Sequence, residues 1–247
     1  MALNWLKLND DKTEFMVLGS KSNLAKVSTQ SITVGDHQIT KSEQVRNIGA
    51  TFDSTVSMEA HVIKTSQSAW YHLFSISKIR PYLTIDQTKC VIHAYVTSRL
   101  DQNNSLLSGV PEYLLYRLQK VQNAAAKVIL GGDRRDHVTV LLKDLHWLPL
   151  SKRFKFKILL LVFKALHDKG PVYLKDLLIP KPCPRVLRIS SENLLDVPRT
   201  RVKYGDRAFS VLGPTLWNDL PTDIRESISI KSFKSALKTH LFKSSYK

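Results

Sequence analysis

The chain has 247 residues, of which 43% are hydrophobic and 23% charged, a composition that excludes a wholly disordered protein and suffices for one or two buried cores. The formal net charge is +16 and is unevenly distributed. Residues 1–109 hold 11 Lys and Arg against 9 Asp and Glu, whereas residues 110–247 hold 26 against 12. Such a positive field attracts polyanions, nucleic acid first and anionic membrane second. A merely basic domain without a specific partner is the alternative.

The cysteine content and the length of the apolar runs indicate the cellular compartment of the protein. Cys90 and Cys183 are too few for a disulfide framework, and Cys90 lies in an apolar helical run, so we expect a buried thiol there. The first residues contain no signal-peptide apolar run, and the longest apolar run, Ile158–Phe163, is too short to cross a bilayer. The sequence therefore predicts an intracellular protein, nuclear or cytoplasmic, with no membrane partner.

Residues 1–55 predict a small β-rich region. The end of a helix is expected at residues 3–9 and a polar loop at 20–29. Strands are expected at 14–19, 31–34 and 44–52, and Gly35-Asp36 favours a hairpin turn after the second of them. Three short strands bury little surface alone, so this region needs something to pack against.

From Met58 onward the apolar period becomes helical. Helices are expected at 58–79 and at 85–100, the second capped by Thr84. The clearest helix is 111–130, whose apolar residues recur at three- and four-residue spacing. Arg117, Lys120 and Lys127 fall together on a neighbouring arc of this helix, which ends at Gly131-Gly132.

The remainder predicts short helices around one extended basic segment. Helices are expected at 138–145, 152–167, 173–178, 206–212 and 215–220, with a break at Gly213-Pro214, and Ser229 caps a last helix. Residues 179–204 mix prolines with cations, among them Arg185, Arg188, Arg199, Arg201 and Lys203. The predicted fold class is α+β, predominantly α-helical.

No catalytic or metal-binding constellation stands out. Phosphate-cradling glycine loops, nucleophile elbows and His-Glu-x-x-His pairs are lacking, and Asp10-Asp11 is an ordinary polar turn. Trp147 and Trp217 are expected to be core anchors rather than stacking platforms. The candidates for phosphate contacts are therefore the basic arc of helix 111–130 and the extended segment, with Arg199, Arg201, Lys203 and Arg207 foremost.

The order of several motifs resembles the part of a LINE-type (non-LTR) retrotransposon reverse transcriptase that follows its catalytic Tyr-x-Asp-Asp hairpin. The motifs run over nearly the full length and include Leu6-Lys7-Leu8-Asn9, Ile48-Gly49-Ala50-Thr51-Phe52-Asp53, Ser98-Arg99-Leu100-Asp101, Leu118-Gln119-x-Val121-Gln122-Asn123, Leu145-His146-Trp147-Leu148-Pro149 and Tyr204-Gly205-Asp206-Arg207.

The resemblance implies a layout and roles for particular residues. Residues 1–55 would be the C-terminal remnant of the palm, 56–131 a helical thumb, and 132–247 a basic helical C-terminal region with the extended segment 179–204. Lys12 would match a lysine that protonates the leaving pyrophosphate. Ile48, Gly49, Ala50, Thr51 and Phe52 would match the hairpin that grips the primer end. The partner implied is an RNA or DNA template–primer.

The resemblance also implies what would be missing. The catalytic aspartates, which hold Mg²⁺ in the complete RNA-directed DNA polymerases, would precede Met1, so we expect no cofactor and no metal site in this chain, and no polymerase activity from it alone. Residual nucleic-acid binding through the thumb and C-terminal region is the expected function of this truncated chain. Two alternatives are half of a split polymerase, completed by a missing N-terminal half, and a domesticated, non-enzymatic helical interaction protein.

Overall fold

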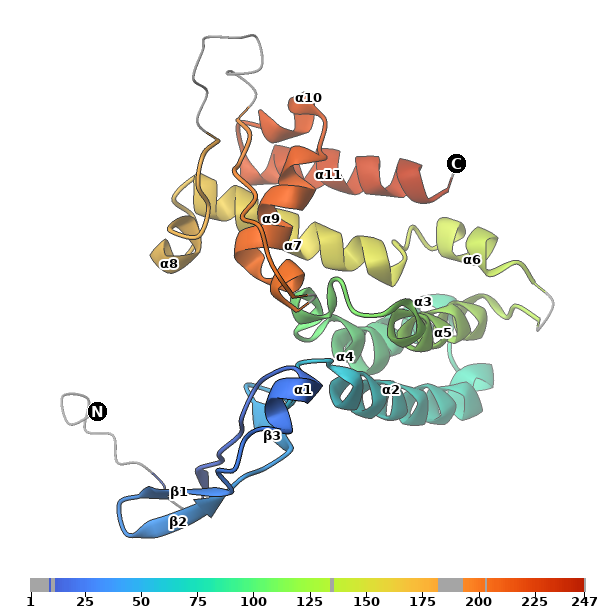
Figure 1. The fold of residues 1–247 in the computed structure, drawn as a ribbon. Coiled ribbons are helices and arrows are strands. Elements are labelled where there is room, and N and C mark those ends of the chain that lie inside the picture. Colours follow the sequence, from blue (N-terminus) through green and yellow to red (C-terminus); the bar gives the residue numbers. More distant parts are fainter. Residues whose placement is uncertain (1–8, 10–11, 134–135, 182–192, 203, 247) are drawn as a thin grey trace. The chain divides into compact units, whose positions relative to one another are not determined.

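A computed structural model describes residue 9 and residues 12–133, 136–181, 193–202 and 204–246 (Figure 1). The chain folds as two units, residues 1–64 and residues 65–247. Helices dominate and two small antiparallel sheets lie in the first unit, so the predicted α+β, predominantly α-helical fold class is confirmed. The boundary expected at residue 131 falls inside the second unit, where helices from both sides of it pack together.

The first hairpin of unit 1 follows directly from the sequence. β1, Ser31–Val34, pairs with β2, His37–Thr40, and Val34 lies opposite His37. Gly35 has a φ of +60°, which a residue without a Cβ adopts at little cost, so the chain reverses within two residues. The predicted strand at 31–34 and the predicted turn are both confirmed.

A second hairpin replaces the single strand expected at 44–52. β3, Gln44–Asn47, pairs with β4, Ala50–Asp53, with Gln44 opposite Asp53. The prediction of one strand was wrong because Ile48 and Gly49 have φ values of +45° and +80°, which turn the chain back on itself. A β-branched residue at positive φ is strained, and alternating polarity does not reveal it.

Two further expectations for unit 1 were wrong. Residues 14–19 form no strand, and only Phe15 makes an isolated bridge, to Lys41. The expected polar loop at 20–29 contains a one-turn helix, α1, Lys21–Leu24, because the Ser20 hydroxyl accepts a hydrogen bond from the Asn23 backbone N–H at 3.2 Å. The helix end expected at 3–9 lies outside the described residues, apart from Asn9.

The carboxylate of Asp53 organises the loop that follows β4. It accepts hydrogen bonds from the backbone N–H groups of Thr55, Ser57 and Met58 and from two hydroxyls. Val56 and Met58 both have positive φ, so these bonds hold a strained backbone in place. Burial alone would raise the pKa of Asp53, but the hydrogen bonds outweigh it and lower that pKa below its ordinary value.

The second unit begins within α2, Glu59–Ile79, the helix expected at 58–79. At the end of α2, Arg80 begins the 3₁₀ helix η3, Arg80–Tyr82. The Arg80 guanidinium donates from Nε to the carbonyl oxygen of Val128 at 2.9 Å and from Nη2 to that of Ile129 at 3.0 Å. These carbonyls belong to the last turn of α5, Glu112–Leu130, so Arg80 completes the end of a helix distant in sequence.

The helix expected at 85–100 is interrupted in its hydrogen-bond pattern. Thr84 caps α3, Ile85–Ile92, as predicted, with Gln87 completing a capping box. A π-helical turn, η4, His93–Thr97, follows and leads into α4, Ser98–Asp101. Asn103 has a φ of +54° and turns the chain into η5, Asn104–Leu107. Cys90 is exposed, so the expectation of a buried thiol was wrong: Thr88 and Ile92 occupy the core-facing positions of α3.

α5 has the bounds and the buried face that its sequence predicts. Leu114, Leu118, Val121, Ala125 and Ile129 are buried, and Gly131, with a φ of +71°, ends the helix. Short α6, Val138–Asp144, precedes α7, Leu150–Leu166, which packs on both α5 and η5. α8, Val172–Lys175, follows.

The last helices complete a core around α7. Trp217 comes from α9, Phe209–Asn218, and Phe233 and Leu237 from α11, Ile230–Ser245, all three nearly inaccessible to solvent. Short α10, Thr222–Arg225, adds Ile224. Phe163 of α7 stacks on Phe233 with 4.2 Å between ring centroids. The predicted Ser229 cap of α11 is confirmed.

Gly213-Pro214 does not break the chain between two helices, as was expected, but lies inside α9. A Cβ at Gly213 would stand 3.0 Å from Cγ2 of Val162, so the glycine permits α9 to approach α7 closely. Packing on α7 thus accounts for a helix that local propensity alone opposes. No helix within the described residues is both long and apolar enough for a membrane span.

Candidate nucleic-acid interface

The solvent-facing side of α5 carries two aromatic and two cationic side chains. Tyr113 and Arg117 are four residues apart, as are Tyr116 and Lys120, so the four side chains follow one stripe of the helix. Tyr113 and Tyr116 are 60% and 59% exposed, and Arg117 and Lys120 are exposed as well. We call these four residues the α5 face. Sequence reasoning found its two cations and missed its two tyrosines.

The two cationic side chains of the α5 face are available to contact a ligand. Within the described part of the chain neither Arg117 nor Lys120 forms an ion pair. Lys120 Nζ lies 4.7 Å from the centroid of the Tyr116 ring, a cation–π contact that holds the ammonium group beside the ring at an exposed site. The arrangement presents flat aromatic surface and positive charge together.

A cleft of about 600 Å³ borders the tyrosines of the α5 face. Tyr113, Tyr116, Gln119 and Asn123 line it from α5, and residues of α6 and the start of α7 line its other side. Glu112 is the one carboxylate among the described lining residues, so the cleft itself does not attract phosphate. Its aromatic and amide lining suits a neutral planar group instead.

Two amide side chains, of half-buried Gln119 and buried Gln122, fix the position of this cleft. Gln119 accepts a hydrogen bond at Oε1 from the backbone N–H of Leu150 at 2.9 Å, and its Nε2 donates to Gln122 Oε1 and to Asn123 Oδ1, both at 2.8 Å. Gln122, 1% exposed, donates in turn to the carbonyl oxygen of Leu148. Gln119 thereby satisfies an N–H group at the start of α7, and the two helices share one polar network.

Lys127, the third predicted cation of this helix, has a different environment. It is half-buried, and its Nζ donates to the carbonyl oxygen of Asp133 at 2.8 Å. The contact closes the turn after Gly131. Lys127 therefore stabilises the end of α5 as well as adding charge near it.

The extended basic segment is described in part. Arg199 and Arg201 are exposed, whereas Lys203, Arg185 and Arg188 lie outside the described residues. The segment from residue 193 runs along α9 (Figure 1), and the side chain of Asn218 bonds both the N–H and the carbonyl of Leu195. Arg207 differs from its neighbours because Nη2 donates to the carbonyl oxygen of Leu106 at 2.8 Å, just before the start of α5.

The residues assigned to the palm by resemblance lie in unit 1. Lys12 is exposed, and its backbone N–H donates to the carbonyl oxygen of Asn9 at 3.1 Å. The residues 48–52 form the turn and part of the second strand of a hairpin, with Ile48 89% exposed at the tip. Ala50 and Thr51 are buried, so only the tip and Phe52 present side-chain surface. The described residues contain no group of three or more His, Cys, Asp and Glu side chains arranged to hold a metal ion.

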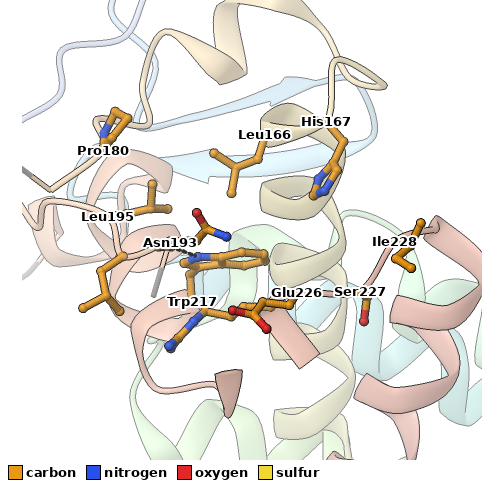
Figure 2. A pocket seen from close by; sticks show the side chains of 11 residues that line it. Leu166, His167, Pro180, Asn193, Leu195, Trp217, Glu226, Ser227 and Ile228 are labelled. Atoms are coloured by element: carbon orange, nitrogen blue, oxygen red, sulfur yellow. Dashed lines mark hydrogen bonds between the residues drawn. The ribbon is translucent and has the colours of Figure 1, made fainter. Parts of the chain in front are cut away.

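A second cavity, of about 560 Å³, surrounds Trp217 (Figure 2). The indole Nε1 donates to the carbonyl oxygen of Asn193 at 2.8 Å, and Leu166 and His167 of the α7 end lie beside the ring. Trp217 is 1% exposed and Trp147 is 9% exposed, which confirms both as core anchors. We assign this cavity no occupant.

Comparisons of the chain with protein-family models, with curated proteins and with solved structures give no match.

Proposed function

We propose that the chain binds nucleic acid through the α5 face, as the thumb and C-terminal part of a LINE-type reverse transcriptase, without polymerase activity of its own. The observation that carries the proposal is the placement of Tyr113, Tyr116, Arg117 and Lys120 on one exposed stripe, beside a cleft lined mainly by uncharged residues. Proteins that bind single strands combine stacking rings with cations that follow the phosphates. Unpaired bases would stack on the tyrosines, and phosphates would contact Arg117 and Lys120.

The positive charge of residues 110–247 supports the same role over a longer range. Their net charge of +14 would draw a template–primer toward the second unit before any contact forms. Exposed Arg199 and Arg201 would extend the phosphate contacts beyond α5. Arg207 would contribute mainly by holding the end of this segment against Leu106.

Fluorescence anisotropy with labelled single-stranded RNA, single-stranded DNA and duplex tests the proposal between about 50 and 200 mM salt. Replacing Arg117 and Lys120 together by Ala should reduce the slope of log affinity against log salt by about 1.5 for single strands. The matched control is Lys21→Ala with Lys26→Ala, two exposed lysines of unit 1 whose loss changes net charge equally. If both double variants behave alike, the α5 face is not the contact surface.

A second candidate is half of a split polymerase, completed by a separate N-terminal half. The two sheets of unit 1 have two strands each, so every described strand has one unpaired edge to which another chain could add a strand. A primer-extension assay with Mg²⁺ and an added polypeptide carrying the Tyr-x-Asp-Asp palm decides this candidate. Activity that requires both chains and falls with Lys12→Ala would support it, and no extension from the mixture would rule it out.

A further inference from the structure

A third cavity, of about 460 Å³, lies in the second unit away from the α5 face. It forms where the π-helical turn η4, the turn before η5, the start of α7 and the side of α11 meet. Its described lining residues are His93, Asp101, Asn104, His146, Trp147, Leu148, Arg153, Phe156, Lys157 and Lys238. Its volume falls in the range of sites for small organic ligands.

One accessible carboxylate, Asp101, lines this cavity. Asp101 accepts from Arg153 Nη2 at Oδ2 and from Asn104 Nδ2 at Oδ1, the latter at 3.3 Å. The Asp101 side chain is nevertheless 34% exposed, and a carboxylate has about four acceptor sites, so it can take further donors. Beside it, Asn104 is 6% exposed, and its Oδ1 has no partner among the described residues. A ligand that carries hydrogen-bond donors would therefore find free acceptor sites on Asp101 and Asn104.

The rim of the cavity is cationic. Lys157 of α7 and Lys238 of α11 are exposed and form no ion pair with a described residue, whereas Arg153 is already paired with Asp101. His93 and His146 also stand at the rim, and no carboxylate other than Asp101 lines the cavity within the described part. Two free ammonium groups on facing helices suit a phosphate group.

Aromatic rings also line the cavity. Trp147 lies 5.5 Å from His93, ring centroid to ring centroid, and Phe156 of α7 contributes a further ring to the lining. The backbone here is also unusual, since His93 begins a π-helical turn and His146 has a φ of +53°. Such features concentrate at functional sites because packing alone does not favour them.

We propose that this cavity binds a nucleoside monophosphate unit, with its phosphate between Lys157 and Lys238 and its base facing Asp101. Guanine fits best, because its adjacent N1–H and N2–H₂ donors can both face one carboxylate. The unit is either a free nucleotide or the 5′-phosphorylated end of a strand. The site shares no residue with the α5 face, so it stands or falls independently of nucleic-acid binding there.

Isothermal titration of the full chain tests the site with GMP, IMP, UMP and inorganic phosphate. GMP should bind more tightly than IMP, which lacks the N2 amino group, and than phosphate alone. Lys157→Gln with Lys238→Gln should weaken GMP binding about tenfold. Lys231→Gln with Lys234→Gln, exposed lysines of α11 outside the cavity, is the matched control and should leave it unchanged.

Oligonucleotides with and without a 5′-phosphate on a terminal guanosine identify the source of the unit. Tighter binding of the phosphorylated strand that is lost in the Lys157 and Lys238 variant assigns the site to strand ends, whereas binding of GMP alone assigns it to a free nucleotide. The proposal is overturned if neither ligand distinguishes that variant from the Lys231 and Lys234 control. Equal affinity for GMP and IMP overturns the placement of the base on Asp101.

Discussion

Gln122 Nε2 donates a hydrogen bond to the carbonyl oxygen of Leu148 across 2.9 Å, 26 residues along the chain. Gln122 lies in the Leu118–Asn123 motif and Leu148 in the Leu145–Pro149 motif, two of the segments that carry the resemblance to reverse transcriptases. The contact therefore gives both motifs a structural role, which is to join α5 to the start of α7. It also supports the cleft beside the α5 face.

Replacing Gln122 by Leu should destabilise the second unit by about 1–3 kcal/mol, because the buried carbonyl of Leu148 and the Gln119 amide both lose a partner. Chemical denaturation followed by circular dichroism measures the change. Gln67→Leu on the exposed side of α2 is the control and should shift stability by less than about 0.5 kcal/mol. Equal effects would mean that the Gln122 bond contributes nothing.

Asp53→Asn should loosen the loop between β4 and α2. An Asn side chain offers one acceptor oxygen where the carboxylate uses two, so we expect a loss of about 1–3 kcal/mol in unit 1. Hydrogen exchange at the Met58 amide should quicken. Asp36→Asn, in the exposed turn of the first hairpin, is the matched control.

The same carboxylate makes unit 1 sensitive to acid. The folded-state pKa of Asp53 is lowered, so its contribution is complete above the unfolded pKa of about 3.9 and is lost as pH falls through the lower folded value. The protection factor of the Met58 amide, its exchange rate relative to an unfolded peptide at the same pH, should therefore fall below about pH 4 in the native chain. The Asp53→Asn variant should lack this fall, and its persistence there would assign the effect to another group.

His61 predicts a second, milder pH dependence. It is 5% exposed and accepts a bond from the Thr51 N–H at Nδ1, and burial first, then the charge of Lys64, lower its pKa from 6.5. The unfolded chain takes up a proton at a higher pH than the folded chain, so the stability of unit 1 should fall as pH drops below about 6.5. An NMR titration of the imidazole checks this, and a pKa at or above 6.5 would contradict it.

Tyr113 and Tyr116 test which form of nucleic acid the α5 face prefers. Replacing both by Ala removes the stacking rings and keeps Arg117 and Lys120, so single-strand affinity should fall about tenfold or more while the salt slope stays nearly constant. Tyr82→Ala and Tyr173→Ala, at exposed positions elsewhere, serve as controls in the same anisotropy assay. A loss confined to duplex would contradict stacking on unpaired bases.

Local signals account for the parts of the fold that the sequence predicts well. The periodicity of α5, the Thr84 and Ser229 caps and the Gly35 turn each depend on residues close in sequence. The strand expected at 44–52 was wrong because polarity alternates through Ile48 without showing its positive φ. Gly213-Pro214 was expected to break the helix because local propensity does not show the close approach of Gly213 to Val162, a residue distant in sequence.

The candidate site likewise combines residues that helical spacing predicts with a cleft that it does not predict. Arg117 and Lys120 could be placed on an exposed arc from helical spacing alone, and Tyr113 and Tyr116, four residues before them, could have been added by the same rule. The cleft beside them could not, because α6, the start of α7 and the end of α11 supply the rest of its lining. The Asp101–Arg153 pair spans 52 residues, and no local pattern points to it.

The bonds from Arg80 to the carbonyls of Val128 and Ile129 bear on the order in which the chain acquires structure during synthesis. Arg80 is synthesised 48 residues before Val128, so its side chain is already present when the last turn of α5 leaves the ribosome. The N-terminal turn of α7 likewise depends on an earlier residue, because Gln119 precedes Leu150 by 31 positions. At both junctions the earlier segment carries the polar side chain and the later one only backbone. Assembly from α2 through α7 can therefore proceed in step with translation.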